Sequence, residues 1–118
     1  MSMPREHAES LYHEWIDAVW RRRVITPDLI DAAFVGHWPT GDVEGPAGLE
    51  SVVAQTHSMF EKLDFAVDLG PLVDGDYVIG RWTGVGSSAR GETRFTGNDI
   101  LRLRNGKVVE YWPATASS

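Results

Sequence analysis

The chain has 118 residues, of which 42% are hydrophobic and 24% are charged, and this composition is typical of a globular protein. A chain of this length is expected to form one domain, residues 1–118, with one core. The formal net charge of −6 argues against a nucleic-acid-binding surface, because phosphate contacts need a net basic stripe. The longest apolar runs are too short to cross a bilayer. We therefore expect neither nucleic-acid nor membrane partners.

The residue types present also restrict the chemistry. There is no cysteine, so disulfides, thiolate metal ligands and a cysteine nucleophile are excluded. Histidine pairs and carboxylate clusters at metal-ligand spacing, phosphate-binding loops and a Gly-x-Ser-x-Gly motif are missing. We expect no metal and no cofactor. The N-terminus lacks the apolar stretch of a secretory signal, so the expected location is the cytoplasm.

The first part of the chain has helical periodicity. Between residues 6 and 23, apolar side chains recur every three or four positions, which predicts an amphipathic helix. Thr26-Pro27-Asp28 is typical of a helix start and predicts a short second helix that ends near Ala33. Residues 34–38 are apolar and aromatic and predict a short strand, which a loop beginning at Pro39 follows.

The second part changes from helical to strand periodicity. Gly45-Pro46 predicts the start of a third helix that ends near Lys62. Alternating apolar residues then predict four antiparallel strands, with turns at Asp74-Gly75-Asp76 and Asn105-Gly106 and a flexible connection over residues 84–91. The expected strands cover residues 65–69, 77–85, 93–104 and 107–112. Helices segregated from an antiparallel sheet predict an α+β fold.

The last hairpin carries a recognisable pattern. Residues 97–112 read Gly-Asn-Asp-Ile-Leu-Arg-Leu-Arg-Asn-Gly-Lys-Val-Val-Glu-Tyr-Trp, which resembles the terminal hairpin of SnoaL-like proteins. Gly45-Pro46-Ala47-Gly48-Leu49 and the segment 73–78 resemble further parts of the same family, in the same order. The resemblance implies a nuclear-transport-factor-two-like cone: a curved, mixed, mostly antiparallel sheet wrapped around three helices from the N-terminal half, with an apolar pocket.

Asp99 is the strongest candidate for chemistry. Strand alternation places it on one face with Phe95, Gly97, Leu101 and Leu103, so one carboxyl group lies within an apolar face. Such a group must be paired, hydrogen-bonded or neutral, because desolvation raises its pKa. The resemblance implies an acid/base group or a protonated oxyanion-hole donor at this position.

Two further residues are expected to assist Asp99. If the resemblance sets the inward parity of the strand over residues 77–85, Arg81 faces the pocket and pairs with Asp99. Asp99 could then be a neutral donor, an ionised base or a structural ion-pair partner, and the sequence leaves these alternatives open. His37 lies beside Trp38-Pro39, where isomerase-like relatives carry a carboxylate base, and could transfer protons or be a solvated loop histidine.

Aromatic and apolar residues are expected to form the pocket wall. Trp15 stands where the resemblance implies an oxyanion-hole tyrosine, and its indole N–H can donate but not exchange a proton. The expected substrate-binding residues are Trp15, Trp38, His57, Phe60, Val85, Leu101 and Tyr111. We expect Trp82, Ile100, Arg102 and Trp112 on the outer face of the sheet, where they would form a homodimer contact.

The resemblance implies a cofactor-independent enzyme that acts on a hydrophobic, oxygen-bearing small molecule. Cyclisation, isomerisation, dehydration and epoxide opening all occur in this superfamily, and a fold alone does not choose among them. Asp99, His37 and Arg81 are the expected catalytic residues. The alternative is a noncatalytic domain of the same fold that binds a small molecule or forms a dimer.

Overall fold

The computed structural model describes residues 4–117 of the chain. Helix α1 (Arg5–Glu14) continues directly into a π-helical segment, η1 (Trp15–Arg21). A hairpin of β1 (Ile30–Trp38) and β2 (Gly41–Glu44) leads into helix α2 (Gly45–Ser58). Four long strands complete the chain: β3 (Lys62–Asp74), β4 (Tyr77–Ser88), β5 (Gly91–Arg104) and β6 (Lys107–Ser117).

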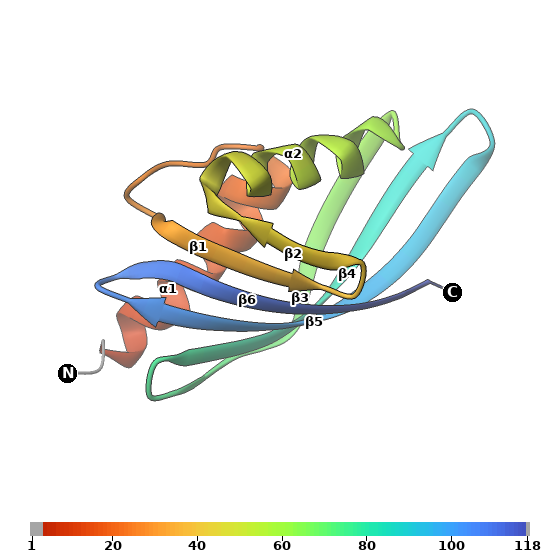
Figure 1. The fold of residues 1–118 in the computed structure, drawn as a ribbon. Coiled ribbons are helices and arrows are strands. Elements are labelled where there is room, and N and C mark those ends of the chain that lie inside the picture. The colour runs from red at the N-terminus through yellow and green to blue at the C-terminus, as the bar shows by residue number, and fades with distance from the viewer. Residues whose placement is uncertain (1–3, 118) are drawn as a thin grey trace.

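The strands form one curved, mixed sheet. Its strand order is β2-β1-β6-β5-β4-β3, in which only the β1–β6 pair is parallel. Figure 1 shows the sheet curving around α1 and α2. The α+β cone and the mostly antiparallel sheet are therefore confirmed. No helix within residues 4–117 has the length and apolar character needed to cross a membrane.

The core lies between the helices and the concave face of the sheet. The predicted helix over residues 6–23 is confirmed in position, although its second half is π-helical. Its buried stripe includes Leu11, Trp15 and Val19, and α2 contributes Leu49 and Val53. These side chains meet buried residues of the sheet, among them Val78, Leu101 and Val108.

The short second helix predicted from Thr26 is wrong. The carbonyl oxygen of Thr26 accepts hydrogen bonds from the amides of Leu29 and Ile30, so a single turn forms there. The chain then enters β1, which pairs with β6 with Ile30 opposite Val108. Burial of Ile30 and Phe34 in the core and pairing with a neighbouring strand override the local helix-start signal.

The flexible connection predicted over residues 84–91 is also wrong. β4 continues to Ser88 and β5 starts at Gly91, so Ala89-Arg90 is a tight turn between two long strands. Pairing of Ser88 with Gly91 fixes the register of the whole hairpin and sets Gly80 opposite Asp99. The third predicted helix is confirmed but ends at Ser58, because residues from Lys62 onward pair with β4.

Candidate functional site

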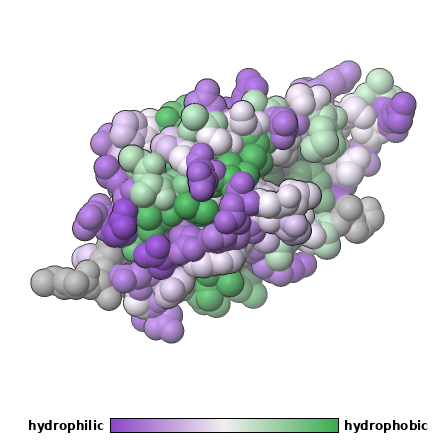
Figure 2. Space-filling model, viewed as in Figure 1, coloured by the Kyte–Doolittle hydropathy of each residue, from purple (hydrophilic) through white to green (hydrophobic). Residues whose placement is uncertain are grey.

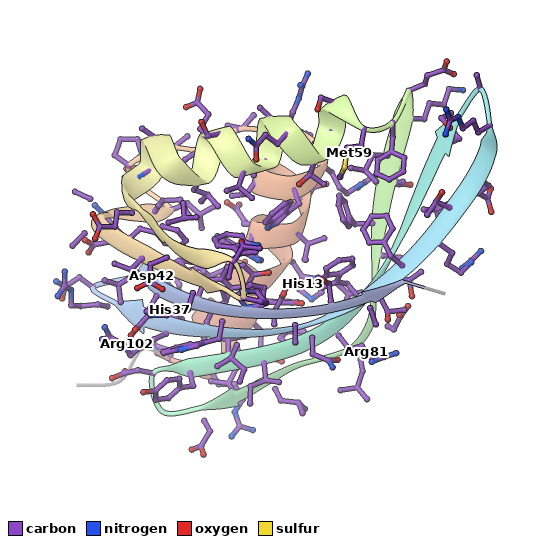
Figure 3. The ribbon with its side chains drawn as sticks, turned by 45° about the vertical axis from the view of Figure 1, so that its right-hand side comes forward. His13, His37, Asp42, Met59, Arg81 and Arg102 are labelled. Atoms are coloured by element: carbon purple, nitrogen blue, oxygen red, sulfur yellow. The ribbon has the colours of Figure 1, made fainter. Side chains whose placement is uncertain are left out.

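An apolar cavity of about 370 Å³ lies between the helices and the sheet. Aromatic side chains make up much of its wall, and Met59 lies at the C-terminal end of α2, where Figure 3 shows it over the sheet. Figure 2 shows hydrophobic residues gathered in the middle of one face of the molecule, bordered by hydrophilic ones. The lining residues are Ile16, Trp20, Trp38, Thr56, Met59, Phe60, Phe65, Trp82, Thr93, Phe95, Tyr111, Pro113, Thr115 and Ala116.

A buried polar cluster lies next to this cavity, and Asp99 is its centre. Asp99 is 1% exposed and is the only buried carboxyl group among the described residues. The Tyr111 hydroxyl donates a hydrogen bond to Asp99 Oδ1 at 2.6 Å. The Tyr12 hydroxyl donates to Asp99 Oδ2 at 3.2 Å. Each carboxyl oxygen therefore has its own phenol partner.

Strand register and helix packing bring these three groups together. Leu101 on β5 pairs with Tyr111 on β6, so Tyr111 reaches diagonally to Asp99, two residues away along β5. Tyr12 arrives from α1 and lies over Gly80, the residue that pairs with Asp99. A Cβ atom at Gly80 would lie 2.4 Å from the Tyr12 hydroxyl oxygen, so only glycine leaves room for this contact.

Two indole groups complete the surroundings of Asp99. The Trp82 and Trp15 side chains lie near enough to favour its charged form. Trp15 Nε1 is nevertheless buried without a regular hydrogen bond, which leaves an unpaired donor beside the cluster. Trp82 is packed against the glycine backbone of β5, because a Cβ atom at Gly97 would lie 2.1 Å from its ring.

Burial dominates the protonation of this cluster. Desolvation raises the pKa of Asp99 above its ordinary value, and the hydrogen bonds from Tyr111, Trp82 and Tyr12 offset only part of that effect. Desolvation and the neighbouring Asp99 charge also raise the pKa of Tyr111 well above its ordinary value. Tyr12 shifts in the same direction for the same reasons. The phenols therefore stay neutral, and the carboxyl group is the member that titrates.

Arg81 is not part of this cluster, and its expected inward placement is wrong. Along β4 every second residue from Val78 to Gly86 is buried, so Arg81 lies on the outer face, where it donates a hydrogen bond to Asn98 at 3.1 Å. Figure 3 shows its side chain pointing away from the sheet. The register of the β4–β5 hairpin decides this, since Asp99 pairs with Gly80.

The same change of parity corrects two further expectations. Val85, expected in the pocket, lies in a shallow groove on the outer face of β3, β4 and β5. Trp82, expected on the outer face, is 6% exposed and lines the cavity. Ile100 and Arg102 do lie on the outer face, as expected, and so does Trp112, which stacks on His37.

His37 also faces outward, in a network of charged groups. It pairs with Asp42 across the β1–β2 hairpin, with Nδ1 and the carboxylate oxygen 3.0 Å apart. Its Nε2 lies 2.6 Å from Glu110 Oε2, and Arg102 donates to the other oxygen of Glu110 at 2.8 Å. Figure 3 shows His37, Asp42 and Arg102 gathered at one end of the sheet, away from Met59. The structure does not bring His37 to Asp99.

Of the other predicted binding residues, some line the cavity and the rest lie outside its lining. Trp38, Phe60 and Tyr111 line the cavity. Trp15 and Leu101 are fully buried behind the lining residues. His57 is outside the lining and lies 2.6 Å from the Trp20 carbonyl oxygen, so it joins α2 to η1.

Sequence reasoning missed Tyr12 as a partner of Asp99. Tyr12 lies one helical turn before Trp15, so helical spacing already placed both on one buried face. Trp20, Phe65 and Phe95 were also not selected as lining residues. The turn at Ala89-Arg90 fixes the pairing of β4 with β5, and this pairing places Trp82 on the same face of the sheet as these lining residues.

The described residues include no group of three or more histidine, aspartate or glutamate side chains placed to hold a metal ion. Among the described residues, Tyr111 lines the cavity and is hydrogen-bonded to Asp99, which Tyr12 also contacts. This arrangement can hold and move a proton beside an apolar ligand.

Comparison with known proteins identifies the family. The SnoaL-like domain model matches residues 12–111, and the chain therefore belongs to the SnoaL-like domain family. Among curated protein sequences, none matches this chain.

Solved structures share the fold at low sequence identity. A protein from Jannaschia, provisionally named a SnoaL-like polyketide cyclase, superposes with a TM-score of 0.82 at 17% identity over 98% of this chain and 90% of the other. TsrD from Streptomyces laurentii superposes with a TM-score of 0.79 at 18% identity, over 96% of this chain and 90% of TsrD. A protein from Bacillus cereus, provisionally named a polyketide cyclase, superposes with a TM-score of 0.74 at 24% identity, over 92% of this chain and 71% of the other. These likenesses establish the fold and leave the reaction open.

The His37 network predicts a pH-dependent contribution to stability. Hydrogen bonds with Glu110 and Asp42 raise the pKa of His37 above its ordinary value. The stabilisation by protonated His37 is therefore fully present below the unfolded pKa, about 6.5, and is lost as pH rises through the higher folded pKa. His37→Phe keeps a ring beside Trp112 but removes both hydrogen bonds. We expect it to lower the free energy of unfolding more at about pH 5.5 than at about pH 9.

Urea unfolding of wild type and variant at both pH values measures this difference. His7→Phe on the exposed side of α1 is the control, because His7 lies outside the network. An equal loss of stability at both pH values for His37→Phe would show that its charge contributes nothing.

Proposed function

We propose that this protein is an enzyme that uses acid/base chemistry, without a cofactor, on a hydrophobic small molecule that carries an oxygen group. Cyclisation, isomerisation, dehydration and epoxide opening are the candidate reactions, with a biosynthetic role in secondary metabolism. The observation that carries the proposal is the buried Asp99 carboxyl group, held by two tyrosine hydroxyls directly behind the wall of an apolar cavity.

The cavity supports a hydrophobic ligand. The described lining residues are mostly aromatic and aliphatic, and none of them has a side chain that is charged at neutral pH. A charged ligand would lose its hydration there without gaining a counter-charge from the wall. An apolar ligand with one or two oxygen atoms suits this lining, because the few polar groups present can orient those atoms.

The Asp99 cluster supports proton transfer. Burial raises the pKa of the Asp99 carboxyl group, which makes its neutral form more accessible than that of an ordinary aspartate. Two phenol and two indole side chains around Asp99 favour its anion when it gives up the proton. A group that can hold the proton in one step and return it in another is what these candidate reactions need.

The rival proposal is a noncatalytic binding domain. It is favoured by the placement of Arg81 and His37 on the outer face, because neither then joins Asp99 at the cavity. Under this alternative the tyrosine pair would only satisfy a buried structural carboxyl group, and ligand binding would not be followed by turnover.

Asp99→Asn distinguishes the two proposals. Asparagine has nearly the same shape but cannot exchange a proton, so we expect ligand stabilisation to persist and turnover to fall by about 100-fold or more. Thermal-shift screening against an anthraquinone, a 3-oxosteroid, limonene 1,2-epoxide and a naphthol finds ligands, and mass spectrometry follows each for product. Asp28→Asn in the exposed turn before β1 is the matched control. Full turnover by Asp99→Asn would contradict the enzymatic proposal.

We further propose that the outer face of the sheet forms a homodimer contact. Leu72, Ile79, Ile100 and Trp112 are successive cross-strand neighbours on β3 to β6, and they form an apolar row on that face. Ile79 is 39% and Ile100 40% exposed. A row of apolar side chains across an uncovered face is typical of an interaction surface.

Ile100→Glu tests the dimer. We expect wild type to have twice the chain mass in light scattering at micromolar concentrations and Ile100→Glu to be monomeric, because a buried charge would oppose association. Val24→Glu is the control, since Val24 has nearly the same exposure, 42%, but lies outside the sheet. A monomeric wild type across this concentration range would reject the proposal.

A further inference from the structure

The wall of the cavity contains a single titratable side chain. Among the described lining residues, Tyr111 is the only one with an ionisable group, and the remainder are apolar, indole or threonine side chains. Asp99 itself is outside the lining and is 1% exposed. Tyr111 is therefore the titratable side chain of the described wall that a ligand in the cavity would contact.

The hydrogen bonds of the cluster make Tyr111 and Tyr12 inequivalent. Both phenols donate to Asp99, at 2.6 Å from Tyr111 and 3.2 Å from Tyr12. Only Tyr111 also lines the cavity, whereas Tyr12 is fully buried between α1 and the backbone of β4. One phenol side chain thus belongs to both the cavity wall and the Asp99 cluster, and the other belongs to the cluster alone.

We propose that Tyr111 is the residue that exchanges a proton with the ligand, and that Asp99 acts through it as the group behind the wall that holds the proton. This inference rests on the proposed function, because it assigns the contact with the ligand within the same site. It predicts that the two tyrosines, although bonded to the same carboxylate, have different roles.

The exchange is balanced as a two-proton relay. A hydroxyl group of the ligand gives its proton to Tyr111 Oη, while the Tyr111 O–H bond breaks and its proton passes to Asp99 Oδ1. The ligand becomes an anion, Asp99 becomes a neutral acid, and Tyr111 ends with one O–H bond as it began. In the reverse direction, neutral Asp99 returns the proton through Tyr111 to the ligand. A hydroxyl group can play this part because it donates one hydrogen bond and accepts others.

The surrounding groups favour a relay over an ionised tyrosine. Burial and the Asp99 charge raise the pKa of Tyr111 far above its ordinary value, so a tyrosinate is strongly disfavoured. Trp82 also lines the cavity and interacts with Asp99, but an indole N–H donates a hydrogen bond without exchanging its proton at ordinary pH. Among the described wall residues, Tyr111 is therefore the one whose hydroxyl group is hydrogen-bonded to Asp99 and can pass it a proton.

The test uses 2-naphthol, whose excited state is a strong acid and whose neutral and anionic forms emit at different wavelengths. We expect wild-type protein with bound 2-naphthol to show naphtholate emission when Asp99 is ionised, in a series from about pH 5 to 9. Excitation is set beyond the tryptophan absorption band. Tyr111→Phe keeps the ring in the wall but removes the hydroxyl. We expect this variant to bind 2-naphthol still, with naphtholate emission at least about tenfold lower than in wild type.

Tyr12→Phe is the matched control. It removes the other phenol from the same carboxylate, so we expect the naphtholate emission to appear at a higher pH than in wild type, because the Asp99 anion has lost one donor. Above that pH we expect the emission to persist, because Tyr12 is outside the cavity wall. Full emission in Tyr111→Phe together with loss in Asp99→Asn would overturn the relay and leave the proposed function standing. Full emission in Asp99→Asn, or no binding of 2-naphthol by wild type, would overturn both.

A measurement on wild type alone covers the case in which Tyr111→Phe does not fold. The rate of naphtholate formation is followed by time-resolved fluorescence in mixtures of H2O and D2O. Two protons move in the relay, so a plot of the rate against the deuterium fraction of the solvent should be curved. A straight line would indicate a single transferred proton and direct contact between the ligand and Asp99, which contradicts the proposal.

Discussion

The burial of one carboxyl group is the constraint on which the site depends. Asp99 lies within an apolar face of β5, where an unpaired charge would cost several kcal/mol, of order 5 or more. Hydrogen bonds from Tyr111 and Tyr12 reduce that cost, and they come from opposite ends of the sequence. The cluster therefore fixes α1, β5 and β6 relative to one another, and Gly80 on β4 leaves the space in which Tyr12 fits.

The two faces of the sheet separate the polar groups by role. The concave face has one titratable cluster behind an aromatic wall, where low polarity strengthens each hydrogen bond to Asp99. The outer face has the ionic network of His37, Glu110 and Arg102, which joins β1 to β6 and β5 near solvent. Charges that strengthen the sheet are thereby kept away from the cavity, and the cavity can accept an apolar ligand without a competing ion.

The sequence predicted the fold better than it predicted the site. Asn105-Gly106 and the alternation around Asp99 marked the last hairpin correctly, because a turn with two positive φ angles and a one-sided buried strand leave clear local patterns. Ile30 belongs to a strand only because β6 lies beside it, which no local pattern contains. The resemblance implied an inward Arg81, whereas pairing of Gly80 with Asp99 in the β4–β5 hairpin places Arg81 on the outer face. Helical spacing indicates that Tyr12 is buried, but its hydrogen bond with Asp99 joins residues 87 positions apart, so only the folded structure shows it.

The most direct test of this account is a carboxyl ¹³C NMR titration of the aspartates in the wild-type protein. Burial should raise the pKa of Asp99 above the ordinary aspartate value. Asp31 and Asp64 are internal references, because hydrogen bonds from the Ala33 amide and from Arg21 lower the pKa of these two groups. We predict that Asp99 titrates above the ordinary value while both references titrate below it. An Asp99 that titrates with the references would contradict the claim that a desolvated carboxyl group holds the proton in this site.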